Sequence, residues 1–370
     1  MATESMRRAP RTPWLVLLCS TVLLASPGPA AQTTRPVAAT RQDPVSAILN
    51  AFRSHQLVAV PAGHTDSNQT LALLQAILRD PRLPGTVNDI VVEFGSSRYQ
   101  DLMDQYTRGE DVDEAALRQV WQNAVQAGIA LDNPNTAAFF RLVRDLNATL
   151  EPVRQVRVLL GDPPIDWDNV RSKSDFRKWV VQRDSYPADL VRREVLTRKR
   201  RALILYANAH LLRKEILTNY DMSDWQAQTI ISLLERPGDV RVFTIRSVGS
   251  LAKWQSDTTS WPPMSLTILR GTGLGAVDFA EYDNDNDTRY AIRGVDDFVP
   301  IPRDQWRSLR AEDQVDAFLY TGSGADRTTA PLSSTLCTDP NYVTMRLERI
   351  ALAGLPPGEA DRVKQLCGGR

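Results

Sequence analysis

Residues that commonly carry metal or nucleophilic chemistry are scarce in this sequence. Its 370 residues include three histidines and three cysteines. A closed structural zinc site needs four cysteine or histidine ligands at characteristic spacings, and the sequence has no such cluster. The G-x-S-x-G turn of the common α/β serine hydrolases is also absent. These absences argue against a zinc-stabilised fold and against a serine hydrolase of that type.

An excess of charge of one sign is missing too. The 44 basic residues balance the 44 acidic residues, so the formal net charge is zero. Proteins that bind nucleic acid usually carry a basic patch that neutralises phosphates, and this sequence shows none. We therefore expect a small-molecule or peptide ligand and no nucleic-acid partner. The oligomeric state and any cofactor stay open.

The apolar run at residues 14–25, WLVLLCSTVLLA, is shorter than the roughly 20 residues that a membrane span requires. It follows Arg7, Arg8 and Arg11 and precedes the small residues SPGPAAQ. This order is typical of a secretory signal peptide, which we predict over residues 1–31. We expect a secreted or periplasmic protein with no membrane span after cleavage, and a flexible lead-in at residues 32–44.

Two cysteines, Cys337 and Cys367, lie outside the predicted signal peptide. In an oxidising compartment, an even number of cysteines favours a disulfide, so we predict that these two residues are bonded. The alternative is a pair of buried free thiols.

Short β-rich runs alternate with helical patterns over the first 250 residues. The predicted strands lie at 57–60, 89–94, 155–160, 201–207 and 240–248. Helices are expected near 68–79, 97–107, 134–150, 174–200 and 224–238. A further helix is expected to begin at an N-cap, Asp111, and to stop by Gly128. Pro187 is expected to divide the helix over 174–200. This alternation predicts an α/β fold, a three-layer α/β/α arrangement with a mainly parallel central sheet. We expect a single domain over 45–370 that is less regular from about 250, where strands near 265–271, 287–292 and 315–322 join the same sheet or form an added lobe.

Four ionisable residues fall at or near the carboxyl ends of the predicted strands: His64, Glu93, Asp162 and His210. In open α/β sheets, ligands bind outside the carboxyl ends of the strands, so these side chains are expected to converge. His55 precedes the first strand and is left out. Each residue also has a structural interpretation, since His64 can be a loop residue, Asp162 can cap a turn, and His210 can cap a helix.

Glu93 is the hardest of the four to explain by structure alone. It lies inside the apolar strand DIVVEF, and burying an unpaired carboxylate costs several kcal/mol. It therefore needs a partner, of which a histidine or an arginine is the natural choice. Glu93 and two histidines would also make a set of metal ligands, so the metal question stays open.

The order of these motifs resembles the erythromycin esterase-like, ChaN-like superfamily, which also includes the TIKI-type proteases. Strings such as VNDIVVEFGSSRYQDLMDQYTRGEDV, RVLLGDPPIDWDNVRS and RREVLTRKRRALILYANAHLLR are similar to a family of secreted bacterial proteins within it. The resemblance covers roughly residues 45–368. It implies that His64, Glu93 and His210 are catalytic, with a histidine as the base that activates water. Asp162 and the helical pair Arg183 and Asp184 match positions beside them, which we assign to substrate binding.

One departure from the superfamily pattern concerns the first motif. Pro61 and Ala62 stand where the superfamily has a glutamate shortly before the histidine. Loss of a group that orients a catalytic histidine costs orders of magnitude in rate. The sequence therefore predicts a secreted hydrolase-like protein, with a ligand-, haem- or metal-binding protein as the alternative and a non-catalytic scaffold as a third. For all three we expect Glu93 within hydrogen-bond reach of His210 or Arg183.

Overall fold

Parallel strands form the centre of the fold, as the sequence predicts. The computed structural model describes residues 36–63, 67–214, 228–282, 290–293, 297–300 and 308–368, of which 290–293 and 297–300 are described by their backbone. Within these ranges, seven strands make one sheet in the order β3-β2-β4-β1-β5-β9-β6. Neighbouring strands are parallel except β6, which runs antiparallel to β9 at the edge. The strands of this sheet are β1 (Leu57–Pro61), β2 (Asp89–Ser96), β3 (Arg157–Asp162), β4 (Ala202–Tyr206), β5 (Val242–Val248), β6 (Ser265–Ile268) and β9 (Ala317–Tyr320).

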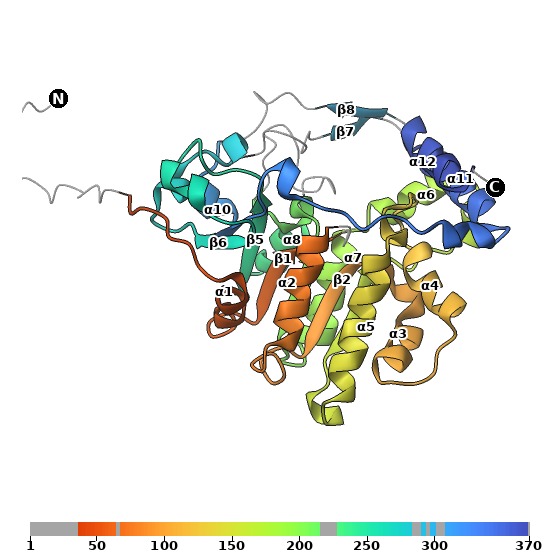
Figure 1. Cartoon of the computed structure of the whole chain (residues 1–370), viewed down its shortest axis with the longest axis horizontal. Helices are drawn as coiled ribbons and strands as arrows, with labels where there is room; N and C mark the ends of the chain where they lie inside the picture. Colours follow the sequence, from red (N-terminus) through yellow and green to blue (C-terminus); the bar gives the residue numbers. More distant parts are fainter. Residues whose placement is uncertain are drawn as a thin grey trace, which may run out of the picture. The chain divides into compact units, whose positions relative to one another are not determined.

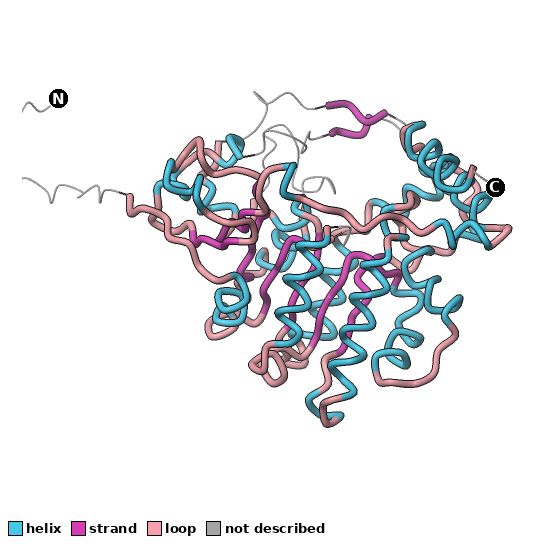
Figure 2. The backbone as a smooth tube through the Cα atoms, in the orientation of Figure 1, coloured by secondary structure: helices cyan, strands magenta, loops and turns pink. Residues whose placement is uncertain are grey.

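Helices cover both faces of the sheet (Figures 1 and 2). The longer helices are α1 (Pro44–Ala51), α2 (Asn68–Arg79), α3 (Gln100–Thr107), α4 (Glu114–Gln122), α5 (Pro134–Ala148), α6 (Lys173–Val180), α7 (Ser185–Val191), α8 (Ile230–Glu235), α11 (Tyr342–Ala353) and α12 (Pro357–Cys367). The shorter ones include η2 (Ala130–Asp132), the π-helix η5 (Arg192–Leu196), η6 (Asn208–Leu211), α9 (Gly273–Ala276), α10 (Ala311–Gln314) and η11 (Ser334–Thr338). The three-layer α/β/α architecture is therefore confirmed.

The strands divide their apolar side chains between the two faces because successive residues of a strand point to opposite sides. Val58 and Val60 of β1 pack with α1, α2 and α5 in one core, whereas Leu57 and Ala59 pack with α7 and α8 in the other. On β2, Val92 and Phe94 join the first core and Val91 joins the second. The same alternation places Glu93 on the face that α7 covers.

Two helix predictions are wrong in detail. The cap of α4 is Asp113, which accepts a hydrogen bond from the Ala116 amide at 2.9 Å, and not Asp111; the helix ends at Gln122, before Gly128. The long helix predicted over 174–200 is divided before Asp184 and not at Pro187. Pro187 lies in the first turn of α7, where its missing N–H leaves no helical hydrogen bond unmade.

The C-terminal third extends the main sheet and also forms a separate ribbon. Strands β6 and β9 join the main sheet, while β7 (Tyr290–Arg293) and β8 (Asp297–Pro300) pair antiparallel with each other. The segment after β9 then passes the carboxyl ends of the central strands (Figure 1). At the start of α2, the Asn68 amide donates to the Thr328 carbonyl of this segment at 2.9 Å. It leads to α11 and α12.

The part of the predicted lead-in that the structure describes is bound to the edge strand β6 and to the turn after it, rather than free. The Gln42 amide donates to the Leu266 carbonyl at 2.7 Å, and the Val37 amide donates to the Gly271 carbonyl at 3.1 Å. Ala39 is buried. The polar composition of residues 32–44 could not predict these contacts, because they are made by the backbone. Among the helices of the described ranges, none is long and apolar enough to traverse a bilayer.

Candidate functional site

Glu93 is the centre of a buried polar cluster at the carboxyl ends of β2, β3 and β4. Its side chain is 1% exposed and forms an ion pair with Arg183, which precedes α7. The Ala207 amide donates to Glu93 Oε2 at 2.7 Å, and Gln126 Nε2 donates to Oε1 at 3.0 Å. The expected contact of Glu93 with Arg183 is therefore confirmed. The carboxylate is thus held by the cation Arg183 and by donors from two further segments.

His210 lies between two carboxylates. Its Nδ1 is 2.8 Å from Asp184 Oδ1, and its Nε2 is 3.6 Å from Glu93 Oε1. Because an ionised carboxylate only accepts, Nδ1 carries the proton in that hydrogen bond. The Ile230 amide at the start of α8 also donates to Asp184 Oδ1, at 2.9 Å, and so fixes the carboxylate. Burial lowers the pKa of His210, but Asp184 and Glu93 together outweigh burial and raise it above its usual value.

Asp162 ends β3 and completes the acidic side of the cluster. It is buried, its Oδ2 accepts from the Val125 amide at 2.5 Å, and its Oδ1 is 3.8 Å from Arg183 Nε. Burial raises the pKa of Asp162 to about 7, although Arg183 and the Val125 amide act in the opposite direction. This carboxyl can therefore take up or release a proton near neutral pH.

The sequence reasoning missed Tyr206, the last residue of β4. It lies on the same face of the sheet as Glu93, and its ring is 5.8 Å from that of His210 between centroids. Its hydroxyl is buried and has no hydrogen-bond partner among the described residues. Burial, followed by the charges of Glu93 and Asp162, raises the pKa of Tyr206 well above its usual value, so the hydroxyl stays a proton donor. A polar residue ending an apolar strand was the available signal.

Two further contributors carried little signal in the sequence. Gln126 follows α4 in an irregular segment whose path the sequence does not determine. Gly63 lies against the cluster, because a Cβ at this position would be 2.1 Å from Glu93 Oε2 and 2.3 Å from the Ala207 nitrogen. A glycine is therefore required for the backbone after β1 to approach Glu93 so closely.

The structure brings together five of the six predicted site residues: Glu93, Asp162, Arg183, Asp184 and His210. The sixth, His64, lies outside the described residues, although Gly63 directly before it contacts the cluster. Ala62 is 4% exposed and packs in the hydrophobic core, so this position supplies no carboxylate. Within the described ranges, no group of three histidine, cysteine or acidic side chains is arranged to hold a metal ion.

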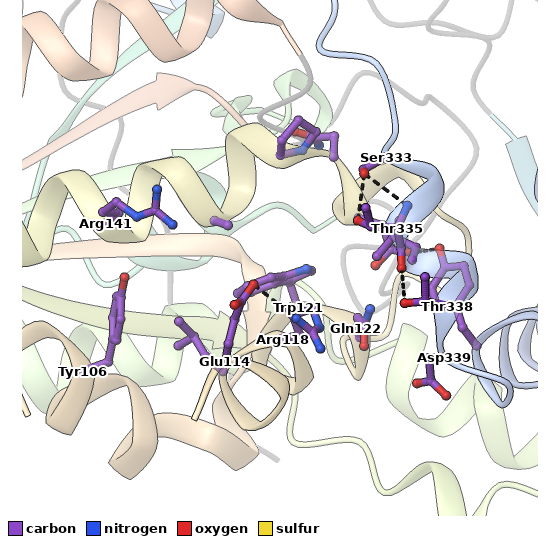
Figure 3. Close-up of a pocket in the computed structure, with 17 residues that line it drawn as sticks. Tyr106, Glu114, Arg118, Trp121, Gln122, Arg141, Ser333, Thr335, Thr338 and Asp339 are labelled. Atoms are coloured by element: carbon purple, nitrogen blue, oxygen red, sulfur yellow. Dashed lines mark hydrogen bonds and ion pairs between the residues drawn. The ribbon is translucent and has the colours of Figure 1, made fainter. Parts of the chain in front are cut away.

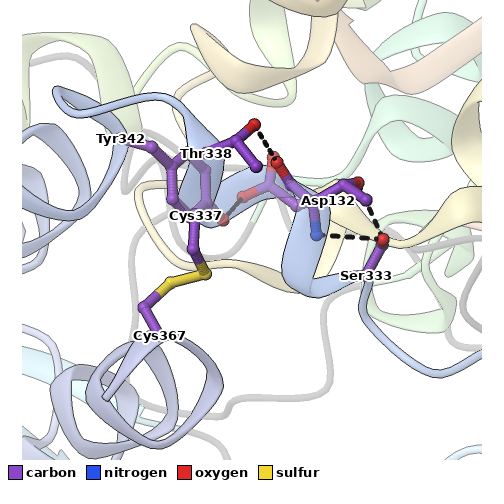
Figure 4. The surroundings of a disulfide bond; sticks show 7 residues. Asp132, Ser333, Cys337, Thr338, Tyr342 and Cys367 are labelled. Carbon is purple, nitrogen blue, oxygen red and sulfur yellow. Dashed lines mark hydrogen bonds between the residues drawn. A yellow bond between two sulfur atoms is a disulfide. The ribbon is translucent and has the colours of Figure 1, made fainter. Parts of the chain in front are cut away.

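A disulfide closes the C-terminal hairpin that α11 and α12 form. Cys337 in η11 is bonded to Cys367 at the end of α12 (Figure 4), as expected from the cysteine count. Beside it, buried Arg346 of α11 forms an ion pair with Asp132 at 2.7 Å, and the Tyr342 hydroxyl donates to the same carboxylate at 2.6 Å. Arg346 also donates to the carbonyl of Gln122, at the end of α4. The hairpin thus packs against the segment that leads to Val125 and Gln126.

Comparison with known proteins identifies a solved structure with a similar fold. No protein-family model and no curated protein matches this chain. The crystal structure of a succinoglycan biosynthesis protein matches with a TM-score of 0.50 and 9% identity, covering 80% of this chain and 96% of that one. A protein from Bacillus cereus matches with a TM-score of 0.46 and 9% identity, over 80% and 97% of the two chains. The type III effector HopBA1 matches with a TM-score of 0.32 and 12% identity, over 57% and 85%. At such identities the first likeness concerns the fold alone: this chain shares its α/β architecture with the succinoglycan biosynthesis protein.

Proposed function

We propose that this protein is a secreted or periplasmic hydrolase of the erythromycin esterase-like superfamily, with His210 as the general base. The observation that carries the proposal is the 2.8 Å hydrogen bond between His210 Nδ1 and Asp184. It holds the proton on Nδ1 and leaves Nε2 as the basic nitrogen, as a carboxylate does for the histidine of a catalytic triad. The disulfide supports the localisation, since disulfides persist in oxidising compartments.

In the proposed reaction, His210 Nε2 takes a proton from a water molecule whose oxygen attacks the carbonyl carbon of an ester or amide. The bond to the leaving group then breaks, and the leaving group takes the proton from His210. Glu93 stabilises the imidazolium that forms when His210 takes up the proton, and Arg183 holds Glu93 in place. The neutral Tyr206 hydroxyl is the donor suited to the developing oxyanion, because it is buried without a partner among the described residues. His64 is a second candidate base, and Asp162 is assigned to substrate binding.

A second candidate function is ligand binding without turnover. The observation that favours it is Ala62, an apolar residue packed in the core where the superfamily has a glutamate. A cluster that has lost this orienting carboxylate can still hold a ligand through Arg183 and its neighbours.

Hydrolysis of a broad panel of esters and amides, with and without divalent metals, tests the proposal. Wild-type protein is compared with His210→Ala and Glu93→Gln, and thermal melting checks that each variant is folded. His55→Ala is the matched control, since His55 lies before β1 and its Nδ1 contacts the Ala51 carbonyl. We expect activity in wild type and His55→Ala, and its loss in folded His210→Ala. Activity that survives in His210→Ala would remove His210 as the base. A panel without turnover, on which a metal or haem raises the melting temperature of wild type alone, would favour the binding protein.

A further inference from the structure

A pocket that shares no residue with the Glu93 cluster lies between α4, the start of α5 and the segment 333–342 that carries η11 (Figure 3). Its volume is about 370 Å³, within the range of about 300–1,000 Å³ that is usual for small-molecule pockets. The three walls come from segments far apart in the sequence, so the pocket exists only in the folded chain. We call it the α4/α5 pocket.

Apolar side chains form the inner surface of the α4/α5 pocket. Leu117 and Trp121 contribute from α4, and Leu336 contributes from η11. The Trp121 ring is 5% exposed and stacks on Phe140, with centroids 6.0 Å apart and planes inclined by 24°. A ring fixed in this way offers a ligand an apolar surface at little cost in side-chain entropy.

The acidic groups around the pocket already have partners within the protein. Glu114 pairs with Arg118 at 3.2 Å, and buried Asp132 pairs with Arg346 at 2.7 Å. The Asp339 carboxylate accepts from the Asn341 amide at 2.9 Å, beside the start of α11, where the helix dipole favours a negative charge. None of these acids needs a cationic ligand.

Arg141 of α5 is different. It lines the same pocket, and it makes no hydrogen bond or ion pair with any residue that the structure describes. Of the two arginines that line the pocket, Arg118 is paired with Glu114, and Arg141 has no acidic partner among the described residues. A guanidinium is well suited to hold a carboxylate or phosphate through two parallel hydrogen bonds.

We propose that the α4/α5 pocket binds a small anionic molecule with an apolar body, whose carboxylate or phosphate pairs with Arg141 while its body lies against Trp121 and Leu336. The η11 wall is fixed before binding, because Cys337 is bonded to Cys367 and the hydroxyls of Ser333 and Thr335 are 2.8 Å apart (Figure 4). The disulfide thus supports the η11 wall of the pocket from outside the lining. This assignment is independent of the proposed hydrolysis, since none of its residues belongs to the Glu93 cluster.

Isothermal titration calorimetry with three probes tests this site on the full oxidised protein. The probes are 2-naphthoate, 2-naphthyl phosphate and the neutral 2-naphthamide, which share an aromatic body and differ in the head group. We expect one or both anions to bind about tenfold more tightly than the amide, which is the contribution of a hydrogen bond to a charged group. The better anion identifies the head group that the pocket accepts.

Arg141→Gln should abolish the preference for the anion. Arg362→Gln, which changes an exposed arginine of α12 outside the pocket, should retain it. Reduction of the disulfide under native conditions should weaken binding of the preferred anion, because the η11 wall is then released. Absence of anion binding at millimolar concentration, or equal binding by wild type and Arg141→Gln, would overturn the proposal. The second result would place the probe elsewhere, for example at the Arg183 cluster.

Discussion

Arg183 and Glu93 lie 90 residues apart in the chain and form an ion pair in which the glutamate is almost completely buried. Glu93 comes from β2, next to the edge strand β3, and Arg183 comes from the turn between α6 and α7. Asp162 stands 3.8 Å from the same arginine on its other side. One cation thus forms ion pairs with two buried acids, and His210 and Tyr206 lie beside them.

Glu93→Gln should destabilise the protein clearly. The amide keeps the shape of the side chain but removes the charge that compensates Arg183, and removing one partner of a buried ion pair costs about 3–5 kcal/mol. The free energy of unfolding in urea, followed by circular dichroism, measures the loss. The control is Glu114→Gln, which breaks the pair with Arg118 at a side chain that is 86% exposed and should cost less than about 0.5 kcal/mol. Equal losses in the two variants would show that the Glu93 pair contributes no more than a surface pair.

Gly63→Ala should also destabilise the fold, for a steric reason. The added methyl group would overlap Glu93 Oε2 and the Ala207 amide, so the hydrogen bond between them must lengthen or break. Overpacking of this kind costs about 1–3 kcal/mol. Thermal melting compares it with Gly273→Ala, where nothing lies within 4 Å of the new Cβ. A Gly63→Ala variant as stable as Gly273→Ala would contradict the close approach of β1 to Glu93.

Stability should depend on pH through Asp162. Burial raises the pKa of Asp162 from 3.8 to about 7 in the folded state. Between these values the folded protein binds more protons at Asp162 than the unfolded chain does, so this residue makes stability fall as pH rises from about 4 to about 7. Asp162→Asn cannot titrate and should lose less stability than wild type over that window. Urea unfolding of both proteins at pH 4.5 and pH 7.5 measures the difference; parallel changes would count against the raised pKa.

Loss of the disulfide should destabilise the C-terminal hairpin. Cys337 and Cys367 are 30 residues apart, and the chain-entropy model assigns about 3–4 kcal/mol to closing a loop of this length. Unfolding of the Cys337→Ser, Cys367→Ser double variant measures the loss. Wild type with reductant should behave like the double variant, and reductant should not affect the variant itself. A stabilising effect of less than about 1 kcal/mol would argue that the contacts of α11, among them Arg346 with Asp132, suffice.

Much of the parallel sheet could be predicted because its strands are short, continuous apolar runs between amphipathic helices. The position of Glu93 inside such a run also predicted that it needs a partner, since an unpaired buried carboxylate is costly. Gln126 could not be predicted in this way. It reaches Glu93 only because the segment after α4 folds over the carboxyl end of the sheet.

Two of the wrong predictions concern residues whose contacts in the fold are distant in the sequence. Pro187 was expected to divide a helix, but the break occurs before Asp184, which accepts from the start of α8 and from His210. The lead-in was expected to be flexible on its composition, but the backbone of Gln42 pairs with Leu266. In both cases contacts made by the folded chain outweighed local preference.

The sequence by itself predicted the alternation of strands and helices, the need of Glu93 for a partner, and the pairing of the two remaining cysteines. These follow from residue periodicity and from composition, which are local properties. The tertiary structure decided the rest: that Arg183 pairs with both Glu93 and Asp162, that the Tyr206 hydroxyl is buried near them, and that η11 forms one wall of the α4/α5 pocket. The strand order and the paths of the loops bring these groups together. Both depend on packing between segments that are far apart in the sequence.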